Sequence, residues 1–298
     1  MQRHEFLILL TLILLIAVPF FVNPYWIRVL TSVLMFSSLV LAQNVLLGYT
    51  GYPAFGGIAF FGMGGYSTAI LMKQGVPFTA SLLAGGLISL LFALFLAPFL
   101  MRLKSHYFAI TTLALQLALM EITNNLEFTG GSHGINLPIY RGEEGPVVFF
   151  FAFWLLTLLA YLVNVYIDRS TFGWALKAIR EDEVSAETLG VNTVMFKSVS
   201  FAIMGWLTAT AGGIYAYWIT YIDPASMFDP VLSVKVFVAL LIGGVGTTWG
   251  PLAGAFGLEI ISEVVWGTFF ELHGVVLGAL IILTILLIPG GISALRRV

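Results

Sequence analysis

The chain has 298 residues, of which 59% are hydrophobic and only 9% are charged, against about 25% charged residues in a soluble domain. Its mean hydropathy is +1.00, which excludes a soluble fold. The net charge of -2 and the lack of a basic cluster exclude a nucleic-acid partner, and the absence of cysteine excludes disulfides, thiol chemistry and iron–sulfur ligation. The sequence is that of a membrane protein.

Apolar stretches of bilayer length recur along the chain. A helix needs roughly 17 to 25 apolar residues to span a bilayer. Eight charge-free stretches approach or exceed this length, and two weaker ones carry carboxylates. In chain order the ten are 6–22, 29–47, 56–72, 79–101, 107–126, 146–167, 198–222, 236–250, 251–270 and 274–290. We therefore expect an all-α, polytopic transmembrane protein with about ten spans (eight to ten), forming a single domain over residues 1–298.

The first stretch also has the pattern of a signal peptide, because Arg3 and His4 precede its apolar core. No small-x-small cleavage site follows, so an uncleaved first span is the favoured interpretation. Basic residues then indicate the topology, since short cytoplasmic loops carry an excess of Lys and Arg. With ten spans and both termini in the cytoplasm, nine basic residues fall inside and four fall outside.

Glycine is concentrated in a 44-residue charge-free run, 29–72, that is too long for one span. Seven glycines lie within the eighteen residues 48–65. Glycine lets helices pack closely and lets a helix break, and a break within a membrane is tolerated where it lines a cavity or is covered by protein. A break would offer backbone groups to a polar solute, whereas tight packing without solute contact is the alternative. The candidate residues of a solute path are Gly48, Thr50, Gly51, Gly56, Gly57, Gly62, Gly64 and Gly65.

Carboxylates inside membranes are costly and usually functional. Glu121 lies near the end of its stretch, so an interfacial position competes with a place on the solute path. Glu259 and Glu263 are one helical turn apart and share a face, where they would meet an ammonium group or lie at the interface. The sequence 130–134 spells G-x-S-x-G, but without the strand, sharp turn and helix of a serine nucleophile it predicts a glycine-rich turn. The four histidines are scattered, and no metal site is expected.

A charged island interrupts the apolar sequence. Residues 168–191 hold 8 of the 28 formal charges, and the topology places them in a cytoplasmic loop at 168–194. One interpretation is a solvated connector that only satisfies the positive-inside rule. The favoured one is a docking element for a soluble partner, because the loop is long and has both apolar and charged faces.

The island is predicted to form a helix, a bend and a second helix. Phe172, Leu176 and Ile179 follow helical spacing, with Arg180 on the opposite side. An acidic cluster at 181–183 then suits the positive end of a second short helix, at about 182–189, and Gly190 suits its C-terminal stop.

A second glycine cluster includes Gly243, Gly244 and Gly246. Paired glycine-interrupted segments in two halves of a transporter point to its path, so these residues join the candidate path. Neither cluster is a phosphate-binding loop, because no Gly-Lys-Ser/Thr follows. The chain therefore has no evident nucleotide site, and an ATPase, where needed, is a separate subunit.

Four blocks of the sequence resemble one family. The stretch GWALKAIREDEVSAETLGV at 173–191 closely resembles the cytoplasmic coupling segment of LivM-type permeases, the membrane subunits of branched-chain amino-acid ABC importers. Residues 46–71 and 112–135 resemble the family's early and central motifs, and 242–255 with 288–292 resemble its C-terminal signature. Counting back from Gly190, the general Glu-Ala-Ala pattern of ABC permeases meets 184–186, of which only Ala186 matches. Residues 52–54 also depart from the more polar early motif, which leaves the solute open.

The resemblance implies a transport subunit that is not itself an enzyme and binds no cofactor. ATP and Mg²⁺ would bind two cytoplasmic ATPase subunits, a second, LivH-like permease would complete the path, and an extracytoplasmic binding protein would deliver the solute. The chain would lie in a prokaryotic plasma (inner) membrane and carry branched-chain or other hydrophobic amino acids by alternating access. The ATPase-coupling residues would be Gly173, Leu176, Ile179, Arg180, Glu181, Asp182, Glu183, Ala186 and Gly190.

Two alternatives stay open. The first is a permease of the same family for urea or short amides. The second is a self-contained secondary transporter that couples to protons through Glu121, Glu259 or Glu263. A docking loop favours an ATP-driven importer, because a secondary transporter has no need of one.

Overall fold

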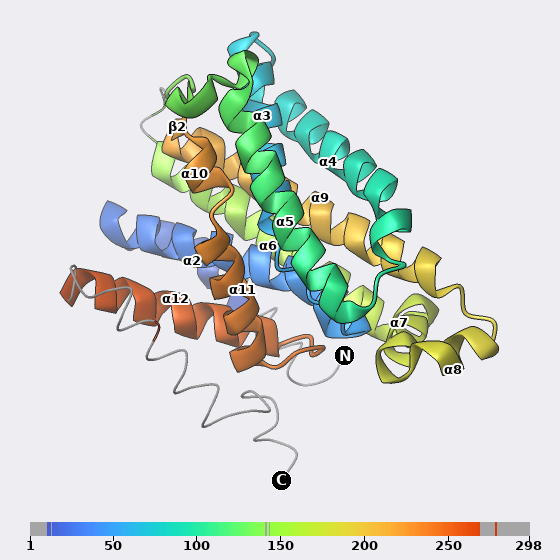
Figure 1. Ribbon diagram of the computed structural model, residues 1–298. Helices are drawn as coiled ribbons and strands as arrows, with labels where there is room; N and C mark the ends of the chain where they lie inside the picture. The colour runs from blue at the N-terminus through green and yellow to red at the C-terminus, as the bar shows by residue number, and fades with distance from the viewer. Residues whose placement is uncertain (1–10, 13, 141, 143, 269–277, 279–298) are drawn as a thin grey trace.

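The computed structural model describes residues 11–12, 14–140, 142, 144–268 and 278. Within these residues the protein is built from helices, apart from two strands of two residues each, which confirms the all-α prediction (Figure 1). The predicted span at 274–290, apart from residue 278, lies outside the described residues, as do residues 6–10 and 13 of the one at 6–22. The pairing of β1 (Ile135–Asn136) with β2 (Tyr221–Ile222) is antiparallel and sets Ile135 opposite Ile222.

The helices follow the predicted stretches closely. Their bounds are η1 (Leu15–Phe20), α2 (Pro24–Gln43), η2 (Asn44–Gly48), α3 (Ile58–Lys73), α4 (Phe78–Leu100), α5 (Ser105–Asn125), η3 (Glu127–Thr129), η4 (Gly131–His133), α6 (Gly145–Arg169), α7 (Thr171–Glu181), α8 (Glu183–Thr188), α9 (Thr193–Ile219), α10 (Pro224–Met227), α11 (Pro230–Gly243) and α12 (Gly250–Thr268). Prolines occupy the first position of α2, α10 and α11, where their fixed φ suits a helix start and no N–H bond is lost.

Five helical segments in the described part of the chain are long and apolar enough to cross a membrane. They are Pro24–Gly48, Phe78–Leu100, Gly145–Arg169, Thr193–Ile219 and Pro224–Gly243. The structure thus has a polytopic membrane fold. Helices α3, α5 and α12 form where spans were predicted but are not among the five, and α3 has only 16 residues.

The prediction of one span over 236–250 was wrong. Helix α11 ends at Gly243, and α12 begins at Gly250. Between them Gly244 and Gly246 have φ values of 114° and 78°, which other residues rarely adopt, so the helix cannot continue. The predicted break in the first glycine run is present: η2 ends at Gly48, and α3 begins only at Ile58.

Helix α9 forms the centre of the molecule and packs against α2, α3, α4 and α6. Its contact with α3 is backbone to backbone. A Cβ atom on Gly64 would lie 2.0 Å from the carbonyl oxygen of Ala209, and one on Gly212 would lie 2.0 Å from that of Phe61. Small residues allow this approach, which fixes α3 and α9 to each other.

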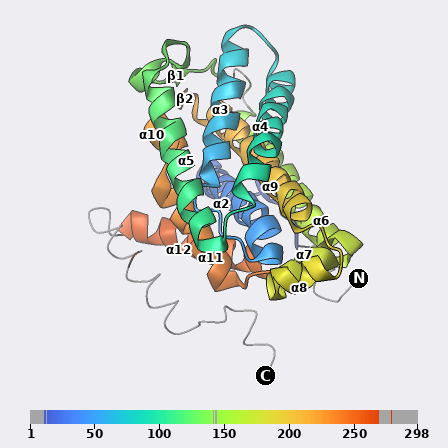
Figure 2. The same cartoon turned by 45° about the vertical axis from the view of Figure 1, so that its right-hand side comes forward.

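The molecule has two distinct ends. Helices α7 and α8 lie at one end, and β1, β2 and α10 lie at the other (Figures 1 and 2). Helix α6 runs from the strand end to α7, and α9 returns from α8 to β2. Because these helices have 25 and 27 residues, the two ends are about 40 Å apart, at about 1.5 Å per residue, enough to cross a membrane.

Candidate functional site

The first half of the charged island is α7, and its sequence sets its start and its buried face. The Ser170 hydroxyl caps the helix by accepting from the Gly173 backbone N–H at 3.1 Å. Leu176 and Ile179 are buried, as their spacing predicted. Gly173 permits a tight corner with α6, because a Cβ atom there would lie 1.7 Å from the carbonyl oxygen of Ile167.

The second half is α8, which begins at the acidic bend. The Asp182 carboxylate caps it by accepting from the backbone N–H groups of Val184 (3.3 Å) and Ser185 (3.2 Å). Hydrogen bonds from Ser185 hold the pKa of this carboxyl below its usual value. Ala186 is buried beneath the helix, and Gly190 follows its end with φ 86°. The predicted helix, bend and helix is therefore confirmed, and its role as an ATPase contact stays a prediction.

Helix α8 is anchored through its first residue. The Glu183 carboxylate forms an ion pair with Lys197 of α9 and accepts a hydrogen bond from the Tyr52 hydroxyl, in the first glycine break. Burial raises the pKa of Glu183, but the hydrogen bonds from Lys197 and Tyr52 outweigh it and hold that pKa below its usual value. The carboxylate is thus charged at neutral pH and joins three elements.

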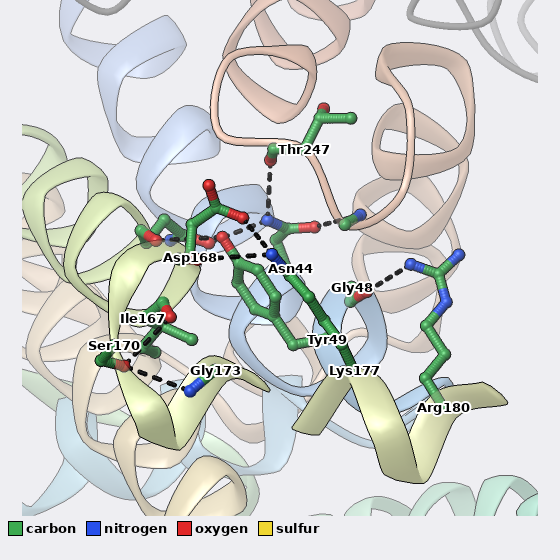
Figure 3. A network of polar contacts seen from close by, with 12 residues as sticks. Asn44, Gly48, Tyr49, Ile167, Asp168, Ser170, Gly173, Lys177, Arg180 and Thr247 are labelled. Carbon is green, nitrogen blue, oxygen red and sulfur yellow. Dashed lines mark hydrogen bonds and ion pairs between the residues drawn. The ribbon is translucent and has the colours of Figure 1, made fainter. Parts of the chain in front are cut away.

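Helix α7 also contacts the first glycine break, through the side chain of Arg180. Arg180 Nη1 donates to the carbonyl oxygen of Gly48 at 2.7 Å (Figure 3). This carbonyl lies at the end of η2, a π-helical turn, where the regular hydrogen-bond ladder stops. The coupling segment, defined here as α7 and α8, therefore contacts the first break at two points, Gly48 and Tyr52.

The two glycine breaks meet beside this contact. Asn44 Oδ1 accepts from the Gly246 backbone N–H at 3.0 Å, and its Nδ2 donates to the Thr247 carbonyl oxygen at 3.0 Å and to Asn164 Oδ1 at 2.8 Å. Figure 3 shows the Asn44 side chain reaching from η2 to the loop after α11. A Cβ atom on Gly246 would lie 2.5 Å from the Gly48 carbonyl oxygen, so the backbones approach closely here.

A polar pocket opens where the coupling segment faces the breaks. Its volume is about 420 Å³. It is lined by Gly48, Tyr49, Asp168, Lys177, Arg180, Glu181, Gly246, Thr247, Thr248 and Trp249. Lys177 and Asp168 form an ion pair of 2.7 Å in its wall. The coupling segment is thus not packed flush against the membrane helices.

The remaining candidate path glycines lie mostly in close helix contacts. Gly56 faces the Thr112 carbonyl of α5, Gly62 faces the Phe228 ring, and Gly65 faces the Met227 side chain. At each of these positions a Cβ atom would come within 2.3 Å of a neighbouring atom. These contacts match the packing interpretation that the sequence left open.

Residues Gly57, Thr50 and Gly51 lie nearer the break itself. Gly57 lines a small cavity between α2, α3, α9 and α11 of about 10 Å³, enough for about one water molecule. The Thr50 hydroxyl donates to the Leu46 carbonyl oxygen at 2.8 Å, and Gly51 has φ 76°. Gly243 packs on Gly250, where a Cβ atom would lie 2.1 Å from a backbone oxygen.

The candidate carboxylates lie apart from the breaks. Glu121 is exposed and accepts from Asn125 Nδ2 at 3.0 Å. Glu259 forms an ion pair of 2.6 Å with Lys235, and Glu263 accepts from the Tyr25 hydroxyl at 3.5 Å. Glu259 is therefore already neutralised by a residue of this chain.

The G-x-S-x-G sequence forms the expected glycine-rich turn. Gly130, Gly131 and Gly134 all have positive φ, and β1 begins directly after them. Across the described residues no group of three His, Asp or Glu side chains is placed to hold a metal ion.

Sequence reasoning missed Asn44, Asn164, Tyr52 and Lys197. Asn44 and Asn164 are buried amides inside charge-free stretches, and Lys197 is a buried cation near the start of α9. Polar side chains in otherwise apolar runs are a signal that would have singled out all three. Tyr52 carried no such signal.

In the part of the chain that the structure describes, a helical bundle with five membrane-length segments and interrupted helices is that of a multi-pass membrane protein. The family model described as "Branched-chain amino acid transport system / permease component" matches residues 25–285, and the chain belongs to this family. The resemblance to LivM-type permeases is therefore confirmed.

The chain is similar to named permeases of two kinds. It is 26% identical to the high-affinity branched-chain amino acid transport system permease protein LivM of Salmonella typhimurium, over 99% of this chain and 76% of the relative. It is 28% identical to the probable LivM of Methanocaldococcus jannaschii, over 74% of this chain and 76% of that protein. It is 30% identical to LivH of Salmonella typhimurium, over 69% of this chain and 63% of that protein. Relatives of both kinds imply a heteromeric transport system.

Proposed function

We propose that this chain is one membrane subunit of an ABC importer that carries branched-chain or other hydrophobic amino acids into the cytoplasm. One observation carries the proposal: the coupling segment contacts the interruption of a membrane helix at two points, through Arg180 at Gly48, where η2 ends, and through Glu183 at Tyr52, within the break. A soluble partner that moved α7 and α8 would therefore act directly on the break.

The outer face of the coupling segment suits a protein partner. Trp174, Val184 and Leu189 are 67%, 69% and 82% exposed, although the same two helices bury Leu176, Ile179 and Ala186. Large apolar side chains exposed on a cytoplasmic loop favour a protein–protein contact. In the proposal an ATPase subunit covers them, and ATP and Mg²⁺ bind there rather than on this chain.

The rest of the proposed assembly is based on the heteromeric system that the LivM and LivH relatives imply. A second, LivH-like permease completes the path, a second ATPase subunit acts on that permease, and an extracytoplasmic binding protein delivers the solute. We place the chain in a prokaryotic plasma (inner) membrane with about ten spans, both termini in the cytoplasm, and the strand end outside. The positive-inside distribution and the position of the charged island support this orientation.

The proposed mechanism is alternating access. ATP binding draws the ATPases together and displaces α7 and α8. Arg180 then pulls on Gly48, the hydrogen bond between Asn44 and Gly246 opens, and the two breaks move apart so that the solute leaves inward.

The solute is assigned from the relatives alone, whose names specify branched-chain amino acids. The decisive experiment reconstitutes the chain with its partner subunits in liposomes and measures uptake of labelled leucine, isoleucine and valine. We expect uptake only with ATP and the binding protein. A thermal-shift screen of that binding protein separates these solutes from urea and short amides. Uptake by this chain alone under a proton gradient would establish a secondary transporter instead.

A further inference from the structure

Lys197 is a buried cation that the proposed function does not yet use. Its side chain is 1% exposed and lies near the start of α9, directly after the coupling segment. An unpaired charge in such a place would be strongly destabilising, so its partners decide why it is tolerated.

Every hydrogen-bond donor of the Lys197 ammonium group has a partner. It pairs with the Glu183 carboxylate, donates to the Tyr52 hydroxyl at 3.1 Å and donates to the Met101 carbonyl oxygen at 2.9 Å. Tyr52 in turn donates to Glu183, which closes a ring of three side chains. We call Lys197, Glu183 and Tyr52 the buried triad.

The triad connects parts of the molecule that otherwise meet little. Glu183 is the first residue of α8, Tyr52 lies four residues after Gly48 in the first break, and Met101 follows the end of α4. Around it, α8 exposes the apolar side chains of Val184 and Leu189. The same short helix is thus free on one side and fixed to the break on the other.

We propose that Lys197 is a positioning residue that transmits displacement of α8 to the first glycine break. With Lys197 in place, α8, the break and the end of α4 move as one body when a partner moves α8. Without it, only the Arg180 contact of α7 with Gly48 joins the coupling segment to the break, and less of the displacement reaches the break. This inference rests on the proposed function, because it requires a partner that moves α8.

If Lys197 only stabilised the fold, a different experimental result would be expected. Replacing a buried ion pair by apolar or neutral groups of similar size is often neutral for stability or even stabilising. Such a replacement would leave the fold and the ATPase contact intact, and a structural role alone would leave transport intact too. If Lys197 instead transmits displacement, the replacement leaves ATP hydrolysis in place and lowers transport.

The test is the double variant Lys197→Met with Glu183→Gln, which removes both charges and leaves neither unpaired. It is assembled with the partner subunits in liposomes, and two rates are measured: phosphate release and uptake of labelled leucine, isoleucine and valine. We expect ATP hydrolysis to persist while the solute taken up per ATP hydrolysed falls about fivefold or more. Unchanged uptake per ATP would overturn the inference.

The chain offers a matched control. Lys235 and Glu259 form another short ion pair, between α11 and α12, that contacts neither α8 nor the first break. The double variant Lys235→Met with Glu259→Gln removes it in the same manner. We expect its uptake per ATP to equal that of the unaltered chain, and a similar fall here would refute a specific role for the triad.

A milder variant covers the case in which the first one does not assemble. Tyr52→Phe removes a single oxygen and keeps the ring, yet it deletes the bonds of Tyr52 to both Glu183 and Lys197. We expect a smaller fall in uptake per ATP, and no fall would contradict the inference. If the unaltered complex shows no ATP-dependent uptake at all, the proposed function fails rather than the triad.

Discussion

At the scale of single residues, the glycines of this protein serve two different purposes. Some occupy positive-φ positions at breaks and turns, as Gly246 does, and others allow two backbones to touch. Sequence alone identified the glycine clusters. It did not show which glycine adopts positive φ and which allows a close backbone contact, because both roles select the same residue type. The distinction depends on neighbours that are distant in sequence.

Gly173→Ala tests a glycine of the second kind. The new Cβ atom would lie 1.7 Å from the Ile167 carbonyl oxygen, a backbone atom that cannot turn aside. We expect the free energy of unfolding to fall by about 1 to 3 kcal/mol and α7 to shift. Thermal unfolding in detergent measures it. Gly257→Ala is the control, since nothing lies within 4 Å of its Cβ position. An equal change in both would refute the close contact at Gly173.

Asn44→Ala tests the amide between the two breaks. It removes the bonds to Gly246 and Thr247 and leaves their half-buried backbone groups without this partner. We expect a loss of about 2 to 3 kcal/mol in the free energy of unfolding. Asn125→Ala, at an exposed amide, should cost little. Equal stability of the two variants would show that Asn44 does not hold the breaks together.

Glu259→Gln and Glu121→Gln test the proton-coupled alternative. Glu259 is paired with Lys235, and Glu121 is exposed. Neither contacts the breaks, so we expect uptake to remain largely intact in both variants. Loss of uptake in either, together with normal uptake after charge changes at 180–183, would favour a secondary transporter.

At the scale of elements, local signals predicted local structure well. The helix, bend and helix of the coupling segment follow from Asp182 as a cap and Gly190 as a stop, and these act within a few residues. The contacts that position the coupling segment against the membrane helices join residues that are far apart in the sequence. Arg180 and Gly48 are 132 residues apart, and Asn44 and Gly246 are 202 apart. A single sequence contains no periodicity that reports such pairings.

The attachment of α8 should depend on pH. The pKa of Glu183 is held below its ordinary 4.5, so the carboxylate and its ion pair persist above that pH and are lost as the pH falls through the lowered value. A spin label at exposed Thr188 would report the mobility of α8. We expect constant mobility from pH 7 to about pH 5 and an increase below pH 4.5.

The Glu183→Gln variant is the control for that titration, because it has no carboxyl group to protonate at this position. Its label mobility should not show the step. An increase already between pH 7 and pH 5 in the unaltered chain would mean that another group fixes α8.

At the scale of the whole molecule, the lack of cysteine makes the orientation directly measurable. A cysteine introduced at one position is then the only thiol in the chain. Ser132→Cys lies at the strand end and Leu189→Cys at the coupling end, and both positions are exposed. In intact cells expressing this chain alone, we expect a membrane-impermeant maleimide to label Ser132→Cys only. After lysis both should react. Labelling of Leu189→Cys from outside would invert the proposed topology.

The contact between α3 and α9 gives the molecule a stiff lever. Gly64 and Gly212 bring the two backbones together along the core, so neither helix can slide without the other. Helix α9 is about 40 Å long, and a tilt of about 5° at its α8 end would move its far end by about 3.5 Å. A small displacement at the α8 end would thus change the spacing between the helices at the strand end.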